Sequence, residues 1–258
     1  KKNNILKAPW LLDWAKNGGW EWFIKAFNDK NFIDALKNTI ILNLLDLVIG
    51  TPMPILMALL LNELAFPKFK RVAQTVLYLP HFLSWVIISS LSLRLLATND
   101  GLVNQIFGTN IAFLGTENNW RATYIVLGIW KECGWNTIIY LAALTGISPE
   151  LYEAAAIDGA GIWQRIIHIM IPAIKKLAGT LLILQIISVF QIMYEPMVLT
   201  KGGPDNASLS LMQLMWQYAF GGSMNYGKAS AVAVIVTLIL LVMTAIYSYF
   251  DRKESDWD

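Results

Sequence analysis

Charged residues, histidine and cysteine are all scarce in this sequence of 258 residues, and each scarcity excludes a class of protein. Charged residues make up 15% and hydrophobic residues 56%, a composition that excludes an ordinary soluble domain. Because Cys133 is the single cysteine, an internal disulfide framework is excluded. The formal net charge of +2 gives no reason to expect a nucleic-acid partner.

Residue patterns for catalysis and metal binding are missing as well. His81 and His168 are the two histidines and stand far apart, which argues against a metal site, and no Ser/His/Asp arrangement stands out. The stretch Gly222–Lys228, GSMNYGK, has the spacing of a phosphate-binding loop. However, Ala229 follows where a magnesium-binding Ser or Thr would stand, and no strand-like segment precedes it. We therefore expect no catalytic residue, metal or cofactor on this chain.

Five long apolar runs predict an all-α membrane protein with about five spanning helices. Each run has about 20 or more residues, enough at a rise of ~1.5 Å per residue to cross a ~30 Å hydrocarbon core. Pro52 and Pro54 lie inside the first run, and Pro80-His81 interrupts the second; membrane helices tolerate proline where neighbours satisfy the freed carbonyl groups. The runs are residues 39–61, 72–96, 121–146, 172–199 and 226–250.

The two ends of the chain lie outside these runs. Residues 1–38 form an N-terminal arm in which tryptophan and phenylalanine alternate with charges, which fits a segment at a membrane interface and equally a short soluble cap. Residues 251–258 form a charged tail. The sequence thus divides into an arm, a transmembrane region over residues 39–250, and a tail.

The distribution of lysine and arginine predicts the orientation. The link at residues 62–71, the central loop at residues 147–171 with the two lysines after it, and the tail carry the positive charge. Residues 97–120 contain no Lys or Arg, and residues 200–225 contain only Lys201. The positive-inside rule therefore places the central loop and the C-terminus in the cytoplasm. The lysine-rich arm disagrees with this assignment, but several later loops support it.

The central loop is too polar to cross a bilayer and predicts two short helices. Ser148 is a suitable N-cap, Pro149 suits the first helical position, and glycine at Gly159 suits a helix end. A second short helix is expected over Ile162–Met170, before Pro172 opens the next apolar run. Three alanines in the first helix would let another protein's backbone approach closely.

These residues resemble the EAA loop of the membrane subunits of binding-protein-dependent ABC importers. The resemblance rests on Glu153-Ala154-Ala155, then Gly159 after three residues, and Ile171-Pro172, where the family usually has Leu in place of Ile171. Further stretches, among them NELAFPKFKR, QTVLYLPHFLSW and LTKGGPDNAS, are similar to the carbohydrate branch and extend the resemblance over nearly everything after Asn31. Family members usually have one more helix before this region, so a sixth, N-terminal helix is expected to be missing here.

The resemblance implies the fold, the partners and the coupling residues. It implies a type I ABC importer transmembrane fold in a bacterial or archaeal inner membrane, with lipid around it. It also implies a second permease subunit, favouring a heterodimer, two ATP-binding cassette subunits that carry ATP and magnesium, and an external solute-binding protein. The residues expected to couple to the ATPases are Glu153, Ala154, Ala155, Asp158, Gly159 and Pro172.

Polar residues in the middle of the third and fourth runs are candidates for a substrate path. An ionised group at mid-bilayer costs about 2.5–3.5 kcal/mol on insertion scales, so it usually faces a bundle interior or a water-filled path. Trp135 and Tyr140 could offer flat faces to sugar rings, whereas Lys131 and Glu132 are adjacent and not expected to pair. The candidates from the residues are Glu132, Trp135, Asn136, Tyr140, Gln185, Ser188 and Gln191; the family resemblance implies sugar contacts near Gln185, Ser188, Val189 and Ile192.

Several other interpretations remain open. The polar groups could serve interhelical packing alone, and Glu195 could line the outer mouth. The same architecture could import another solute, such as an amino acid or a phosphorylated polyol, or the chain could be a membrane scaffold or receptor subunit without transport. Polar groups in mid-run favour transport over a scaffold.

The orientation is testable by cysteine labelling. In a Cys133→Ser background, single cysteines within residues 202–208 should react with a membrane-impermeant thiol reagent added to intact cells. Cysteines within residues 150–162 should react only after the membrane is opened. Equal labelling of both sets from outside would overturn the predicted orientation.

Overall fold

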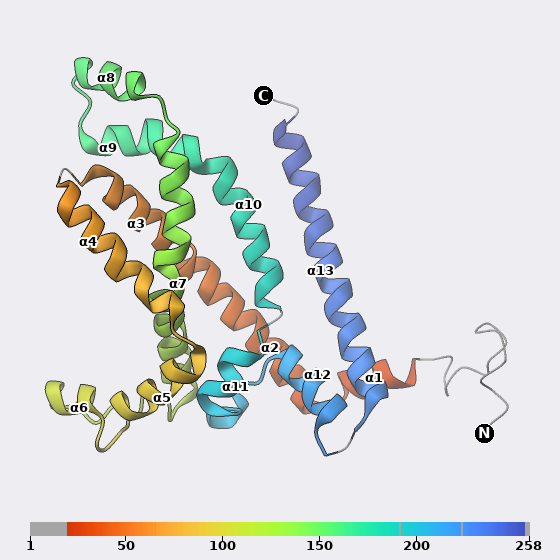
Figure 1. Cartoon of the computed structure of the whole chain (residues 1–258). Helices are drawn as coiled ribbons and strands as arrows, with labels where there is room; N and C mark the ends of the chain where they lie inside the picture. The colour runs from red at the N-terminus through yellow and green to blue at the C-terminus, as the bar shows by residue number, and fades with distance from the viewer. Residues whose placement is uncertain (1–19, 65, 191, 223, 256–258) are drawn as a thin grey trace.

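The computed structural model describes residues 20–255 except 65, 191 and 223, and every regular element within them is helical. The helices run between two ends of the molecule (Figure 1). One end carries α8 and α9, and the other carries α1, α5, α6, α11 and α12. The elements are α1 (Glu21–Phe27), α2 (Lys30–Leu45), η4 (Asp46–Gly50), α3 (Pro52–Glu63), α4 (Pro67–Tyr78), η5 (Leu79–Phe82), α5 (Trp85–Leu95), α6 (Leu102–Phe107), α7 (Glu117–Thr145), α8 (Pro149–Ile157), α9 (Ile162–Arg165), η6 (Ile166–Met170), α10 (Ile171–Val189), α11 (Tyr194–Thr200), η7 (Pro204–Asn206), α12 (Leu211–Phe220) and α13 (Tyr226–Ser255).

Three helices in the described part are long and apolar enough to cross a membrane, or four if one bent pair is counted as a span. They are Lys30–Glu63, Ile162–Ser188 and Tyr226–Ile246, with mean hydropathies of 2.1, 1.7 and 2.7. The helix α7, with 29 residues, is also long enough but does not meet the same standard of hydropathy and charge, and Lys131 and Glu132 stand at its middle. Figure 1 nevertheless shows α7 running among α3, α4 and α10, and it contacts all three, so it forms the centre of the bundle.

Two of the long helices contain a π-turn immediately before a proline. In η4 the Thr51 amide donates to the Asp46 carbonyl at 2.9 Å, and Pro52 follows; in η6 the Ile171 amide donates to the Ile166 carbonyl, and Pro172 follows. Proline lacks an N–H and its ring crowds the preceding turn, so the wider turn accommodates it without ending the helix. The expected short helix Ile162–Met170 is therefore wrong as a separate element, because it continues through Pro172 into α10.

Three boundaries differ from the predicted spans for local reasons. The first helix begins at Lys30 instead of residue 39, because Asp29 accepts a hydrogen bond from the Asn31 amide at 3.0 Å and caps it. The second run turns by 98° between η5 and α5, where Pro80 lies in a 3₁₀ turn and Ser84 caps the new helix. The fourth helix ends at Val189 instead of 199, and α11 is a separate short helix.

Close packing holds α7 against the broken second run. A Cβ on Gly134 would lie 1.9 Å from the Leu77 carbonyl oxygen, so only glycine permits this approach. On another side of α7, the Thr137 side chain is fully buried; its hydroxyl donates to the Cys133 carbonyl of its own helix at 2.6 Å and lies 3.4 Å from the Pro54 carbonyl of α3. These two contacts fix α7 between α4 and α3.

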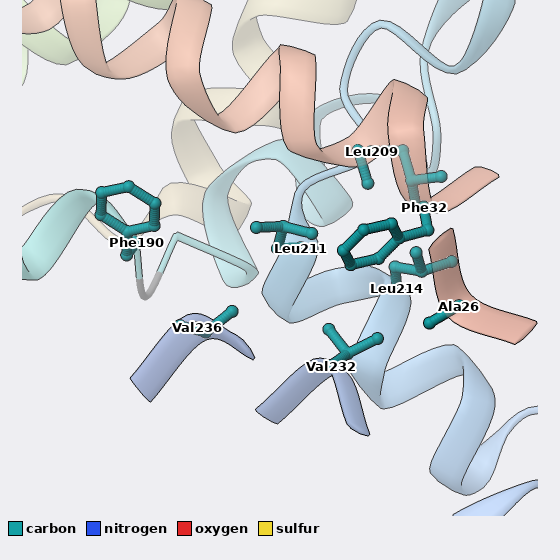
Figure 2. Close-up of a cluster of buried hydrophobic side chains, with 9 residues drawn as sticks. Ala26, Phe32, Phe190, Leu209, Leu211, Leu214, Val232 and Val236 are labelled. Carbon is teal, nitrogen blue, oxygen red and sulfur yellow. The ribbon is translucent and has the colours of Figure 1, made fainter. Parts of the chain in front are cut away.

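A hydrophobic cluster joins the first helices to the last ones at the α12 end (Figure 2). Phe32 of α2 is fully buried among Leu211 and Leu214 of α12, with Val232 of α13 beside them. Phe190, just after α10, belongs to the same cluster. The cluster therefore brings the first and last thirds of the described chain together.

A polar clasp lies beside this cluster and involves the glycine-rich Gly222–Lys228 stretch. Asp29 accepts hydrogen bonds from the Tyr218 hydroxyl and the Lys228 ammonium, both at 2.7 Å. A Cβ on Gly227 would lie 2.4 Å from the Trp22 ring. Lys228 is thus engaged by a carboxylate and Gly227 serves close packing, which leaves no cradle for a phosphate there. Burial alone raises the pKa of Asp29, but the hydrogen bonds from Lys228, Tyr218 and the Asn31 amide outweigh it, so the pKa lies below the ordinary 3.8.

Because the pKa of Asp29 is lower in the folded state, the clasp should stabilise the protein fully above pH 3.8 and lose its contribution as pH falls below that value. Asp29→Asn and Lys228→Met should each cost about 1–3 kcal/mol at neutral pH, because each removes the charge-assisted hydrogen bond between the Lys228 ammonium and the Asp29 carboxylate. Thermal unfolding of the detergent-solubilised protein measures this.

The control for the clasp is Lys30→Met, which removes an exposed cation at the same end of the molecule. If it destabilises as much as Lys228→Met, the effect is one of net charge and not of the clasp. The difference between wild type and Asp29→Asn should also shrink as the pH is lowered; a constant difference would contradict the assigned pKa direction.

Candidate functional site

A cavity of about 640 Å³ lies where the first helix, α7 and α10 meet. The segments η4 and α3 form one wall, α10 forms a second, and α7 forms a third. Trp85 of α5 and Glu195 of α11 border it toward the α12 end. The volume lies within the range of ~300–1,000 Å³ that is usual for ligand pockets.

Most of the α7 wall is a row of residues at every fourth position, with Ile125, Ile129 and Cys133 beside it. Tyr124, Gly128, Glu132, Asn136 and Tyr140 all line the cavity, and residues four apart lie on one face of an α-helix. The row gives the cavity two phenol groups, an amide and a carboxylate. The α7 wall is therefore rich in groups that form hydrogen bonds.

A hydrogen-bonded clamp connects the wall formed by η4 and α3 to the wall formed by α10. The Gln185 amide donates to Asp46 Oδ2 at 2.7 Å, and its carbonyl oxygen accepts from the Thr51 hydroxyl at 2.9 Å. A Cβ on Gly50 would lie 2.3 Å from Asp46 Oδ1, so glycine gives the carboxylate room to bend back along η4. Asp46 and Thr51 were not predicted. The signal for Asp46 was available, since it is the only charged residue in the apolar run 39–61.

A charged cluster connects α7 to the bend before α5. The Lys131 ammonium donates to Glu132 Oε1 and to the His81 carbonyl, both at 2.8 Å, and His81 Nδ1 lies 2.7 Å from Glu132 Oε2. The expectation that Lys131 and Glu132 do not pair is therefore wrong. The long lysine side chain, only 7% exposed, curls toward η5, and the Glu132 carboxylate turns to the same place.

Trp135 lies outside the cavity lining. Its indole stacks on the His81 ring at 4.5 Å between centroids with 6° between planes, because its position on α7 directs it toward η5. The aromatic faces near the cavity are instead those of Trp85 and Tyr124, stacked at 6.0 Å, with Trp120 stacked on Tyr124 at 5.2 Å. Sequence reasoning missed Trp85 and Tyr124, because their neighbours are set by the bend before α5.

The predicted path residues thus divide by position. Glu132, Asn136, Tyr140, Gln185, Ser188 and Ile192 line the cavity, and Glu195 does so as well. Val189 ends α10, but its side chain and the whole of Gln191 lie outside the described residues. These residues therefore lie around one cavity, and their contact with a substrate stays a prediction.

Neither histidine belongs to a metal-binding group among the residues that the structure describes. His81 bonds to Glu132, and His168 Nδ1 lies 3.0 Å from the Gln164 carbonyl of its own helix. Both rings therefore have partners within the protein.

The EAA-like segment forms an exposed tip at the far end from α12 (Figure 1). Ser148 caps α8 and Gly159 ends it with φ of +74°, a left-handed conformation that favours glycine. Nothing lies within 4 Å of where a Gly159 Cβ would be. Around this turn the side chains of Glu153, Ala154 and Asp158 are exposed, Ala155 is half-buried, and Pro172 is exposed at the start of α10.

Apolar side chains dominate the exposed surface of this tip, whereas its base is anchored. Ile157 is 87% exposed, Trp163 73% and Leu151 54%. At the base, Arg165 pairs with Glu63 of α3 at 3.0 Å. Ile166 and Met170 of η6 pack into a cluster with Tyr140 and other residues of α3, α7 and α10. The tip is therefore connected to all three walls of the cavity.

Comparison with known proteins gives three findings. Residues 38–256 match the family described as the binding-protein-dependent transport system inner membrane component. The chain is 41% identical over 248 residues to the polygalacturonan/rhamnogalacturonan transport system permease protein YteP of Bacillus subtilis (strain 168), covering 93% of this chain and 75% of YteP.

Two solved structures are similar as well, each with a TM-score of 0.86 and covering 91% of this chain and 83% of the other. One, at 32% identity, is a bacterial ABC transporter involved in the import of the acidic polysaccharide alginate. The second, at 33% identity, is the bacterial alginate ABC transporter in complex with alginate pentasaccharide-bound periplasmic protein.

Because Gln185 belongs to the clamp, its truncation should lower the stability of the protein. Gln185→Ala leaves the partly buried Asp46 carboxylate without its donor, which should cost about 1–3 kcal/mol of stability. Ser188→Ala is the control, because the exposed Ser188 hydroxyl bonds only to the Gln185 carbonyl in its own turn, at 2.9 Å, and its loss should be nearly neutral.

Thermal unfolding in detergent measures both variants. A cycle with Asp46→Ala should give a coupling energy of the same sign and order, because the two side chains contact directly. Equal unfolding temperatures for Gln185→Ala and Ser188→Ala would show that the clamp contributes nothing.

Proposed function

The chain belongs to the family of binding-protein-dependent transport system inner membrane components, and we propose that it forms one half of a path by which an oligosaccharide crosses a cell membrane. It has the transmembrane fold of type I ABC importer permeases, as its similarity to the alginate importer shows. YteP and the alginate importer chain both serve the transport of carbohydrates.

The observation that supports an oligosaccharide most is the lining of the cavity. Hydroxyl, amide and carboxylate groups from α7, α10 and residues 46–51 line the cavity, and the half-buried Trp85 adds an aromatic face, whereas Tyr124 is buried against Trp85 and Trp120. A sugar presents hydroxyl groups around its edge and apolar C–H faces above and below, so this combination suits it. A scaffold subunit has no need of such a cavity at the centre of its bundle.

The exposed tip of residues 147–171 is the proposed contact with the ATPases. Two ATP-binding cassette subunits would bind ATP and magnesium and hydrolyse the nucleotide, and this chain would supply no catalytic residue. Ile157, Trp163 and Leu151 offer an apolar surface for docking. The Arg165–Glu63 ion pair and the packing of η6 would carry a movement of the tip into α3, α7 and α10.

The orientation follows from the same assignment. The α8 end and the C-terminal tail at residues 251–258 would lie in the cytoplasm of a bacterial or archaeal cell, and Figure 1 shows α13 ending at the height of α8. The α12 end would face outward, where a solute-binding protein delivers the sugar, and the arm at residues 1–38 would lie there or at the interface. A second permease subunit, favoured as a different chain, would complete the path over residues 39–250.

Uptake of labelled oligosaccharides by cells with and without this chain tests the function. Uptake should depend on the chain, and an ATPase subunit should co-purify with it. Trp85→Ala should weaken uptake while the ATPase stays attached, because it removes an aromatic face from the cavity. Uptake of an amino acid or a phosphorylated polyol instead of any oligosaccharide would identify a different solute, and no attached ATPase would favour a scaffold.

Substitution of Gly159 tests coupling through the tip. Gly159→Leu should reduce ATPase attachment and uptake at least about tenfold, because it strains a left-handed turn and fills space open to a partner. Gly108→Leu is a matched control, since Gly108 has φ of +62° and likewise nothing within 4 Å, but caps α6 at the opposite end. Gly108→Leu should keep the ATPase attached; loss of attachment in both variants would indicate general destabilisation.

A further inference from the structure

The short helix α1 exposes three large apolar side chains along one side. They belong to Trp20, Ile24 and Phe27, whose exposed fractions are 65%, 51% and 53%. Positions i, i+4 and i+7 lie on the same side of an α-helix, so the three side chains form one continuous row, the apolar edge of α1. Because apolar surface is unfavourable in water, this edge calls for a less polar environment.

The next side of the same helix is polar. Glu21, Lys25 and Asn28 follow with the same spacing and form the polar edge, about 100° around the helix from the apolar edge. The Lys25 ammonium lies 2.6 Å from Glu21 Oε1, and the side chains of Lys25 and Asn28 are exposed. Ionised groups lose hydration free energy when they leave water, so the polar edge belongs in water.

The third side of α1 packs on the protein at the end of a membrane span. Ala26 is fully buried in the same cluster as Val232 of α13. A Cβ on Gly227 of α13 would lie 2.4 Å from the Trp22 ring, and Gly227 is the second residue of the span Tyr226–Ile246. At the end of a span the hydrocarbon gives way to headgroups and water, so α1 lies at that level.

Other exposed apolar side chains occur at the same end of the molecule. Trp216 and Phe220 of α12 and Tyr226 of α13 are exposed, and aromatic residues are enriched at membrane–water interfaces. On the opposite side of the molecule from α1, and at a similar height in Figure 1, α6 exposes Leu102 and Ile106. These side chains thus indicate the level of one membrane surface, at the α12 end.

We infer that α1 is an interfacial anchor, whose apolar edge inserts among phospholipid headgroups and the upper acyl chains at the α12 end while its polar edge stays in water. A phospholipid surface fits both edges at once, because it changes from apolar to aqueous over about the width of one helix. For residues 20–28 of the N-terminal arm, this selects the membrane interface over a soluble cap.

The contacts that follow α1 connect this anchor to the last two helices. Asp29, directly after α1, accepts hydrogen bonds from Tyr218 of α12 and Lys228 of α13. A helix held at the membrane surface therefore sets the depth at which this end of α13 lies in the bilayer.

The test measures the depth of single positions on α1. The protein, with the subunits that co-purify with it, is reconstituted in vesicles of phosphatidylethanolamine and phosphatidylglycerol. In a Cys133→Ser background, Ile24→Cys is labelled with nitrobenzoxadiazole, whose fluorescence is quenched by iodide in water and by doxyl groups on lipids. Doxyl groups near the headgroups should quench it several-fold more than doxyl groups at the acyl-chain ends, because an interfacial helix buries its apolar face only about 5–10 Å deep.

Lys25→Cys is the matched control, because it is the neighbouring residue, is also exposed and belongs to the polar edge. Iodide should quench its label several-fold more strongly than the label at Ile24→Cys. Leu238→Cys, on the exposed surface of the α13 span, should respond most to doxyl groups at the acyl-chain ends and so calibrates the depth. Phe27→Cys replaces Ile24→Cys if the latter does not assemble.

Two results would overturn the inference. Equal iodide quenching at residues 24 and 25 would place both edges of α1 in water. Protection of residue 24 from iodide without quenching by doxyl lipids would place the apolar edge against protein. Neither result bears on the uptake of oligosaccharides, so the proposed function is tested independently of the anchor.

Discussion

A proline within a helix in apolar surroundings leaves carbonyl groups that the protein itself must satisfy, and this constraint shapes the whole bundle. Pro52 and Pro172 are accommodated by π-turns, and Pro80 by a 98° bend. Each of the three places also positions a polar group. The turn η4 carries Asp46, η5 carries His81, and η6, at the base of the exposed tip, carries His168. The irregular backbone of this protein is therefore found where its polar chemistry is.

The helix α7 is the common partner of these three places. Gly134 lets the broken second run approach, and the buried Thr137 hydroxyl contacts the Pro54 carbonyl beside η4. Near its C-terminal end, Tyr140 belongs to the cavity lining and also packs in the cluster that contains η6. One rigid helix thus connects the bend, the cavity and the tip. This connection gives a physical basis for coupling between the two ends, because packed side chains transmit displacement instead of absorbing it.

Two groups of polar side chains in the bundle are paired across elements. Gln185 joins Asp46 to Thr51, and Lys131 joins Glu132 to the His81 carbonyl. Such pairing lowers the cost of placing polar groups in a membrane bundle.

The sequence by itself determined the features that depend on neighbours in the chain. Apolar runs indicated long helices, Ser148 and Pro149 indicated the start of α8, and Gly159 indicated its end, because caps and turns are satisfied within a few residues. Polar and aromatic residues in the middle of an apolar run also indicated Glu132, Asn136 and Tyr140 as candidates for the substrate path.

Only the tertiary structure decided which residues far apart in the sequence contact each other. The Asp46–Gln185 bond joins residues 139 positions apart, and the Trp135–His81 stacking depends on the direction of the bend. Periodicity assigns a side chain to a face of its own helix but not to a partner on another helix. The pairing of Lys131 with Glu132 was missed for this reason, since the His81 carbonyl that draws Lys131 into place comes from a segment 50 residues away.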